Sequence, residues 1–99
     1  MTKLKINTYK KKSIPKSLRN QVWIERMGEK FDGKCYCCLK KITVFDWECG
    51  HIVSEKNGGH TIIKNLRPIC QPCNRSMGIM NMDEFKNKFF PKQSFFWFF

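Results

Sequence analysis

The chain has 99 residues and carries 19 Lys and Arg against 8 Asp and Glu, which gives a formal net charge of +11 and an isoelectric point near 9.6. A chain of this length has room for one domain with a modest core, and such domains often need a metal ion or disulfides to stay folded. No stretch approaches the roughly 20 apolar residues that span a bilayer, which excludes membrane insertion, while the basic excess favours a polyanionic partner.

The first segment of the chain is basic. Residues 1–13 hold five lysines and few apolar positions, so we expect a flexible arm there and a single folded domain over residues 14–99. The arm has no apolar segment of the kind found in a signal peptide, so we expect an intracellular protein, cytoplasmic or nuclear.

A helix is expected next. Pro15 suits the first turn of a helix, Gly28 suits its end, and Trp23 is the expected anchor to the core. The other apolar positions at helical spacing are Leu18, Val22, Ile24 and Met27.

Strands and two further helices complete the expected fold. Residues 42–47 are rich in β-branched and aromatic side chains and predict a strand that runs on toward residue 51. A glycine turn at 57–59 and a short second strand at 61–63 follow. Helices are expected over 71–80 and, with an asparagine cap, over 81–89.

Two pairs of cysteines have the spacing of metal ligands. Cys35 and Cys38 form one C-x2-C motif, Cys70 and Cys73 form another, and together they predict a closed four-sulfur zinc site. The alternative is two disulfides, which would need an oxidising compartment. Of the two remaining cysteines, Cys37 is expected to face away, with its exchange for Cys38 left open, and Cys49 is expected to be a small buried residue of a strand.

A histidine and an asparagine lie between these two C-x2-C turns, which are called knuckles below, and a second asparagine directly follows the second turn. The runs are Gly50-His51-Ile52, Asn65-Leu66-Arg67-Pro68-Ile69-Cys70 and Cys73-Asn74. With them, residues 34–85 resemble HNH endonucleases of the ββα-metal type, here as an H-N-N variant, and especially the small stand-alone HNH proteins of large DNA viruses and phages. The resemblance implies an α+β fold on a four-cysteine zinc-knuckle frame with flanking helices, and hydrolysis of DNA phosphodiester bonds with one divalent ion. If the chain is viral, its compartment is that of the host.

The resemblance assigns one role to each of the three residues. His51 matches the family's first histidine, Asn65 its central asparagine and Asn74 its final His or Asn. Attack of water on a phosphodiester needs a proton acceptor, and neutral imidazole, with a pKa of about 6.5, suits that task. The amide oxygen of Asn74 suits a hard ion such as Mg²⁺ or Mn²⁺, although Asn74 could also cap a helix. Asn65 is suited to hydrogen-bond the backbone of the loop that carries His51.

One position departs from the family pattern. Many HNH sites place Asp or His directly before the base histidine, as a metal ligand, and Gly50 stands there in this chain. Two residues back along a strand returns a side chain to the same face, so Glu48 is the expected second ligand of the catalytic ion. Asp46 or water could serve instead, or the domain could be a non-catalytic zinc-stabilised module that binds DNA.

The remaining expectations concern DNA contacts and self-association. Four basic residues near the motif in sequence are candidates for phosphate contacts, with a solvated surface as the alternative: Lys56, Lys64, Arg67 and Arg75. His60 is expected to be exposed and not a ligand. The chain ends in five aromatic residues, 95–99, for which packing on the core or a homodimer contact is expected.

Overall fold

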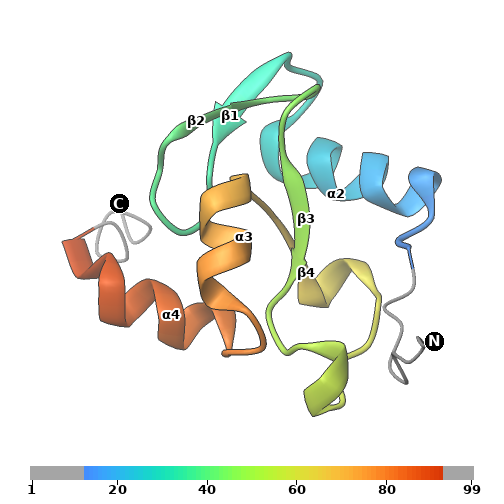
Figure 1. The fold of residues 1–99 in the computed structure, drawn as a ribbon. Coiled ribbons are helices and arrows are strands. Elements are labelled where there is room, and N and C mark those ends of the chain that lie inside the picture. Colours follow the sequence, from blue (N-terminus) through green and yellow to red (C-terminus); the bar gives the residue numbers. More distant parts are fainter. Residues whose placement is uncertain (1–12, 93–99) are drawn as a thin grey trace, which may run out of the picture.

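The structure, a computed structural model, describes residues 13–92 as a small α+β fold, which confirms the expected class (Figure 1). Its helices and strands are α2 (Lys16–Met27), β1 (Asp32–Lys34), β2 (Lys41–Thr43), β3 (Glu48–His51), β4 (Leu66–Ile69), α3 (Gln71–Met77) and α4 (Met82–Phe89). Two 3-10 turns, η1 (Glu55–Asn57) and η2 (Ile63–Asn65), lie between β3 and β4. Nearly all of the expected basic arm, and the whole aromatic tail, fall outside the described residues.

The first helix follows the sequence closely. Pro15 is the N-cap of α2, and Gly28, with φ of +77°, ends it. Trp23 is 3% exposed; its indole N–H donates to the Lys30 carbonyl (2.9 Å), and its ring lies 5.2 Å from that of Trp47. Ile24, expected among the apolar positions, is 51% exposed, because the buried stripe of α2 lies on Val22 and Trp23 instead.

Two separate antiparallel strand pairs, β1–β2 and β3–β4, form the sheet structure. The single strand expected over 42–47 is wrong, since β2 ends at Thr43 and the chain turns before β3 begins. Asp46 N donates to the Thr43 carbonyl (2.9 Å) in that turn, and Phe45 is 86% exposed. The aromatic and β-branched residues of 42–47 therefore lie partly in β2 and partly in the turn that follows it, and their composition does not distinguish the two.

The partner of β3 is β4, and the strand expected at 61–63 is wrong. Leu66 pairs with His51 and Pro68 with Cys49 in the β3–β4 register. A proline normally argues against a paired strand because it has no N–H to donate. Here the Pro68 carbonyl accepts from Tyr36 N (3.0 Å), so the backbone of Pro68 faces away from β3 and the missing donor interrupts no ladder bond.

Two helices follow β4 directly. α3 ends at Met77 and not at the expected residue 80, because Gly78 adopts a positive φ of +57°. Asn81 caps α4 as expected, its side-chain oxygen accepting from Glu84 N (3.1 Å). No helix within residues 13–92 has the length and apolar character needed to cross a membrane.

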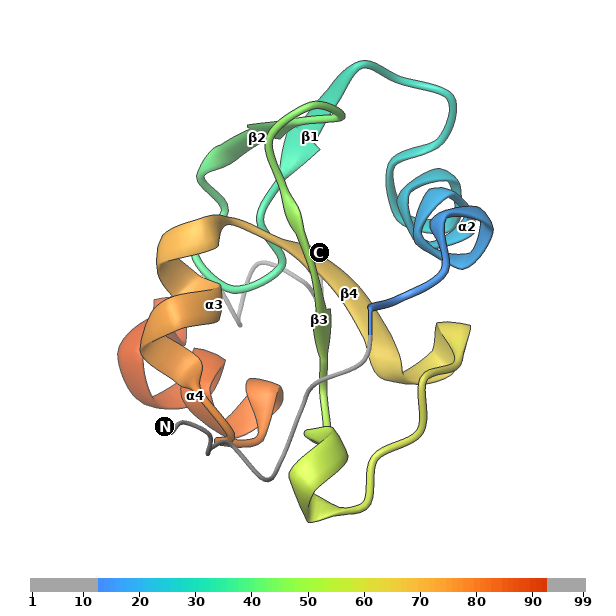
Figure 2. The same cartoon turned by 45° about the vertical axis from the view of Figure 1, so that its right-hand side comes forward.

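The β3–β4 hairpin lies at the centre of the molecule. Figures 1 and 2 show α2 on one side of this hairpin and α3 and α4 on the other. Leu66 and Ile69 of β4 are fully buried, in the same core cluster as Val22 from α2 and Met82 from α4. The hairpin is thus held from both sides, which fixes the position of the residue at the end of β3.

Candidate metal centre and active site

Four cysteine thiols converge where the two knuckles meet. The sulfur atoms of Cys35, Cys38, Cys70 and Cys73 all lie within 4.8 Å of one another, and those of Cys38 and Cys70 are 3.8 Å apart. Two sulfur ligands of a tetrahedral zinc ion, each about 2.3 Å from the metal, lie about 3.8 Å apart. The four cysteines are therefore positioned to form a metal site, and their spacing fits zinc.

Backbone hydrogen bonds shape the first knuckle. Cys35 N donates to the Lys40 carbonyl (2.8 Å), and Leu39 N donates to the Cys35 carbonyl (3.0 Å). Closing this turn places Leu39 at φ of +65°, a left-handed conformation that is uncommon for a residue other than glycine. The second knuckle joins β4 to α3, with Cys70 as the N-cap of the helix and Cys73 in its first turn.

Cys37 lies in the first knuckle but outside the sulfur cluster. It is fully buried, and its backbone N–H donates to the Cys35 sulfur (3.4 Å). The hydrogen bond between the two side chains raises the pKa of the Cys37 thiol and lowers the pKa of Cys35 to about 4, while burial raises the pKa of Cys38 to about 11. The geometry therefore gives Cys38, not Cys37, as the ligand, and binding a metal must release protons.

The other cysteine, Cys49, is half-buried in β3, and burial raises its pKa to about 11. All six cysteines of the chain lie within the described residues and are free thiols, so the disulfide alternative is not what the structure shows.

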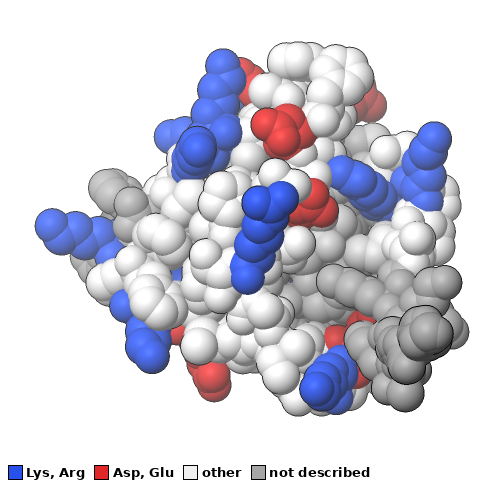
Figure 3. Space-filling model, viewed as in Figure 1, with Lys and Arg blue, Asp and Glu red and all other residues white. Residues whose placement is uncertain are grey.

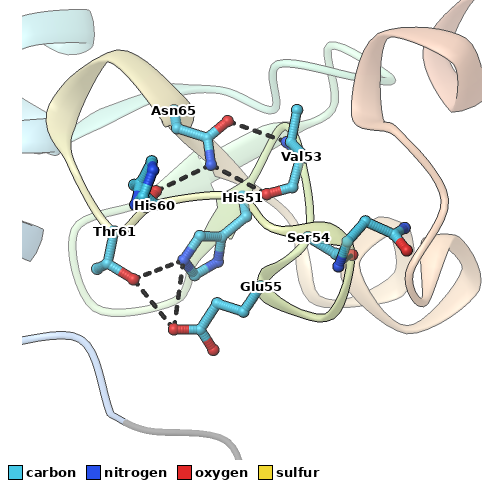
Figure 4. Close-up of polar contacts among 8 residues, drawn as sticks. His51, Val53, Ser54, Glu55, His60, Thr61 and Asn65 are labelled. Carbon is cyan, nitrogen blue, oxygen red and sulfur yellow. Dashed lines mark hydrogen bonds and ion pairs between the residues drawn. The ribbon is translucent and has the colours of Figure 1, made fainter.

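His51 ends β3 and is 6% exposed. Its Nε2 lies 3.0 Å from the Thr61 hydroxyl and 3.9 Å from Glu55 Oε2, as Figure 4 shows. The Thr61 hydroxyl in turn donates to Glu55 Oε2 (3.1 Å). A buried imidazole is thus held by a hydroxyl and a carboxylate from the segment that connects β3 to β4.

Asn65 spans the same connecting segment. Its side-chain oxygen accepts from Val53 N (2.9 Å), and its amide nitrogen donates to the carbonyls of Val53 (3.0 Å) and His60 (2.9 Å). These bonds tie the residues just after His51 to those just before β4 (Figure 4). His60 is exposed, as expected.

A pocket of about 250 Å³ opens beside His51. Its lining residues are His51, Ser54, Glu55, Lys56, Asn74, Met77, Gly78 and Ile79. Asn74 is half-buried, and its backbone N–H already donates to the Cys70 carbonyl (3.1 Å) within the helix. The pocket therefore joins an imidazole, a carboxylate and an amide, and the amide oxygen is a donor suited to a hard cation.

The space beside Gly50 is closed. A Cβ at this position would lie 2.7 Å from Ile69 Cδ1 and 2.9 Å from Met82 Cε, so a larger side chain would displace both core residues. Glu48 lies two residues before Gly50, on the same face of β3 as Gly50, and is half-buried. Asp46 is exposed. Glu48 is not among the residues that line the His51 pocket.

The basic candidates divide into two groups. Lys56, Lys64 and Arg75 are exposed, and Lys56 lines the His51 pocket. Arg67 is half-buried and serves the fold: its Nη1 donates to the Lys64 (3.1 Å) and Leu66 (2.7 Å) carbonyls, and its guanidinium lies 5.5 Å from the centre of the Tyr36 ring.

Thr61 and Glu55 were not singled out from the sequence. Thr61 was assigned to a strand, where its hydroxyl would have had no assigned partner. The one sequence feature that could have pointed to this pair is Glu55, an acidic residue four positions after His51. Its carboxylate reaches the ring only because of the path that the loop takes.

A β-hairpin that ends its first strand in a buried histidine and is followed by a helix bearing an asparagine, with paired cysteine knuckles around it, defines a ββα-metal domain. The HNH endonuclease family model matches residues 35–90, and the chain belongs to that family. No curated protein and no solved structure matched the chain. The resemblance to viral and phage members stays a prediction.

Proposed function

We propose that this chain is a metal-dependent endonuclease that hydrolyses phosphodiester bonds of DNA, with His51 as the general base. The observation that carries the proposal is the buried His51 ring, held by Thr61 and Glu55 in a pocket that Asn74 also lines. Membership of the HNH endonuclease family supports nuclease activity in general.

In the proposed reaction, His51 accepts a proton from the attacking water. The new P–O bond forms as the bond to the leaving oxygen breaks, and solvent reprotonates that oxygen. Asn65 fixes the connecting segment through its three backbone contacts, so the ring keeps its orientation while the charge on it changes. Both the basicity of the His51 ring and its fixed orientation therefore contribute to the proposed reaction.

The chain offers oxygen donors for a Mg²⁺ or Mn²⁺ ion near this ring. Asn74 would hold the ion through its amide oxygen, with Glu48 as second ligand and water in the remaining positions. When bound, the ion would neutralise negative charge on the phosphate and the leaving oxygen. Glu48 is chosen because position 50 is closed and residue 48 is the next one on the same face of β3.

The cysteine cluster would hold a structural Zn²⁺ ion. Its four sulfurs fit the separation expected in a tetrahedral zinc site, and four protein ligands leave no open position for catalysis. Free thiols also fit a reducing, intracellular compartment.

Cleavage of supercoiled plasmid tests the base assignment. We expect nicked or linear product with Mg²⁺ or Mn²⁺ and none with chelator, and at least about a hundred-fold slower cleavage by His51→Ala, because general-base catalysis typically contributes that much or more. His60→Ala is the matched control, since the His60 side chain does not line the pocket and is expected to be dispensable. Equal rates for the His51 and His60 variants would contradict the proposal.

Titration with Mg²⁺ tests the second ligand. Glu48→Gln is expected to raise the Mg²⁺ concentration for half-maximal cleavage about tenfold or more, because removing a metal ligand weakens the site. Asp46→Asn is the control, since that carboxylate is exposed at the turn before β3. An unchanged Mg²⁺ requirement in Glu48→Gln would show that water or another group completes the shell.

A non-catalytic DNA-binding module is the second candidate. It is favoured by Gly50, whose position in many family members carries a metal ligand and here has room for none. DNA binding by wild type and His51→Ala alike, without cleavage under any metal condition, would establish this function in place of the first.

A further inference from the structure

We propose that Thr61 and Glu55 form a positioning relay that fixes the tautomer of His51, with the ring proton on Nε2 and the basic lone pair on Nδ1. The consequence for catalysis rests on the proposed nuclease function, but the tautomer itself does not. Neither Thr61 nor Glu55 is expected to touch substrate.

The single hydrogen of the Thr61 hydroxyl determines which atom is the donor in each hydrogen bond of the relay. The Thr61 hydroxyl has one hydrogen and donates it to Glu55 Oε2 over 3.1 Å. The same oxygen of Thr61 lies 3.0 Å from His51 Nε2, so it must be the acceptor in that contact and Nε2 must carry a hydrogen. In a neutral imidazole the other ring nitrogen, Nδ1, is then unprotonated and can act as the base.

The orientation of the ring agrees with this assignment. Nε2 points toward Thr61 and Glu55, while the second ring nitrogen faces away from Thr61 (Figure 4). The His51 side chain is only 4% exposed, so bulk water has little access to compete for Nε2. A buried donor left without an acceptor is destabilising, which is why the hydroxyl opposite Nε2 matters.

Glu55 has a second effect, through its charge. Its Oε2 lies 3.9 Å from Nε2, too far for a direct hydrogen bond but close enough to attract a charged ring. When His51 takes a proton from water, the imidazolium that forms carries its charge beside this carboxylate. The arrangement has the same logic as the Asp of a serine protease triad, which orients the histidine and stabilises its charged form.

The connecting segment holds the relay in place. Thr61 follows His60, whose carbonyl accepts from the Asn65 amide (2.9 Å), and Glu55 begins η1 after Ser54. Gly59 N also donates to the Ser54 carbonyl (2.9 Å), which ties the two sides of the loop together. Hydroxyl and carboxylate are therefore positioned by backbone contacts that do not involve the ring.

The tautomer can be measured directly by ¹⁵N NMR of the imidazole nitrogens at a pH where the rings are neutral. The chain has only two histidines, so His60, which lies outside the relay, serves as the internal reference. We expect His51 to show one protonated Nε2 and one unprotonated Nδ1, and His60 to show averaged shifts of a tautomer mixture. In Thr61→Val the His51 shifts should move toward those of His60, and Thr61→Ser, which restores the hydroxyl, should return them.

Kinetics separate the two positioning residues. Thr61→Val is expected to lower kcat about ten- to a hundred-fold with KM unchanged, and Thr61→Ser to recover most of it, since general-base catalysis contributes about 10²–10⁴ in total. Glu55→Gln can still accept from Thr61, so it should keep the wild-type tautomer while lowering kcat about tenfold, a modest part of that same contribution. Its Mg²⁺ requirement should not change.

Three results would overturn the relay. They are a His51 tautomer mixture in the wild type, unchanged His51 shifts in Thr61→Val, and a raised Mg²⁺ requirement in Glu55→Gln, which would make Glu55 a metal ligand. A chain that shows the expected tautomers but cleaves no DNA would overturn the nuclease proposal and leave the relay standing.

Discussion

Gly59 is the residue at which the loop around His51 has no room for a side chain. A Cβ there would collide with the Val53 carbonyl oxygen and would lie 2.9 Å from the Asn65 amide nitrogen. Both atoms take part in the Asn65 contacts that hold the segment together. The sequence predicted a glycine turn at 57–59 but gave no sign that Gly59 lies where two backbone segments approach each other.

We predict that Gly59→Ala lowers stability by about 2–3 kcal/mol, measured by urea unfolding in excess Zn²⁺, because backbone atoms must shift to admit the methyl group. Cleavage should fall at least about tenfold, since the contact that fails is one that positions His51. Gly58→Ala is the matched control: φ is +92° there, but nothing lies within 4 Å of its Cβ. It should cost about 1 kcal/mol and leave cleavage within about twofold. Equal cleavage by the two variants would contradict the positioning argument.

His51, Asn65 and Asn74 could be picked out from the sequence because their order and spacing, with the paired cysteines, resemble the motif of HNH endonucleases. Thr61 and Glu55 were not readable, since the segment between β3 and β4 is shaped by individual hydrogen bonds and not by a repeating pattern. The sequence therefore pointed to the three residues of the motif and missed the two loop residues that contact the His51 ring.

At the scale of elements, the metal knuckles join parts of the chain that are distant in sequence. Cys35 and Cys38 belong to the turn between β1 and β2, while Cys70 and Cys73 connect β4 to α3. A metal ion at this point would fix the start of α3, and with it Asn74, against the hairpin that carries His51. We therefore expect the arrangement of His51 and Asn74 to depend on metal binding at the cysteines.

We predict that Cys73→Ser loses bound zinc and most of its folded structure, measured by metal analysis and by thermal unfolding. Zinc binding contributes folding free energy directly in small metal-stabilised domains, with apparent values of about 10–16 kcal/mol in zinc-finger peptides. Cys49→Ser is the control, because Cys49 is half-buried outside the cluster. A stable, zinc-free Cys73→Ser protein would show that the core alone maintains the fold.

Helices were predicted better than strands. α2 and α4 follow from apolar spacing and from their flanking Pro15 and Asn81. β4 was missed because Pro68 argues against a strand, and it forms because Pro68 faces the knuckle and not β3. Long-range pairing decides strands, and a single sequence contains little direct information on it.

At the scale of the whole molecule, the chain carries a net charge of +11. In the view of Figure 3, basic side chains are scattered, with acidic ones between them, and do not gather into one patch. Arg67 is partly withdrawn from the surface by its contacts with backbone carbonyls and with Tyr36. Phosphate contacts are therefore expected from exposed residues close to the pocket.

We predict that Lys56 and Arg75 each contact a DNA phosphate. Each phosphate contact contributes about 0.9 to the slope of log affinity against log salt, so Lys56→Ala and Arg75→Ala should each reduce the slope measured by fluorescence anisotropy by about that amount. Lys41→Ala is the control, because Lys41 lies 3.6 Å from Asp32 on the separate β1–β2 hairpin. If all three variants change the slope equally, the charge acts as a diffuse attraction. If only the first two do, DNA lies across η1 and α3, beside the pocket that holds His51 and Asn74, which is where cleavage requires it.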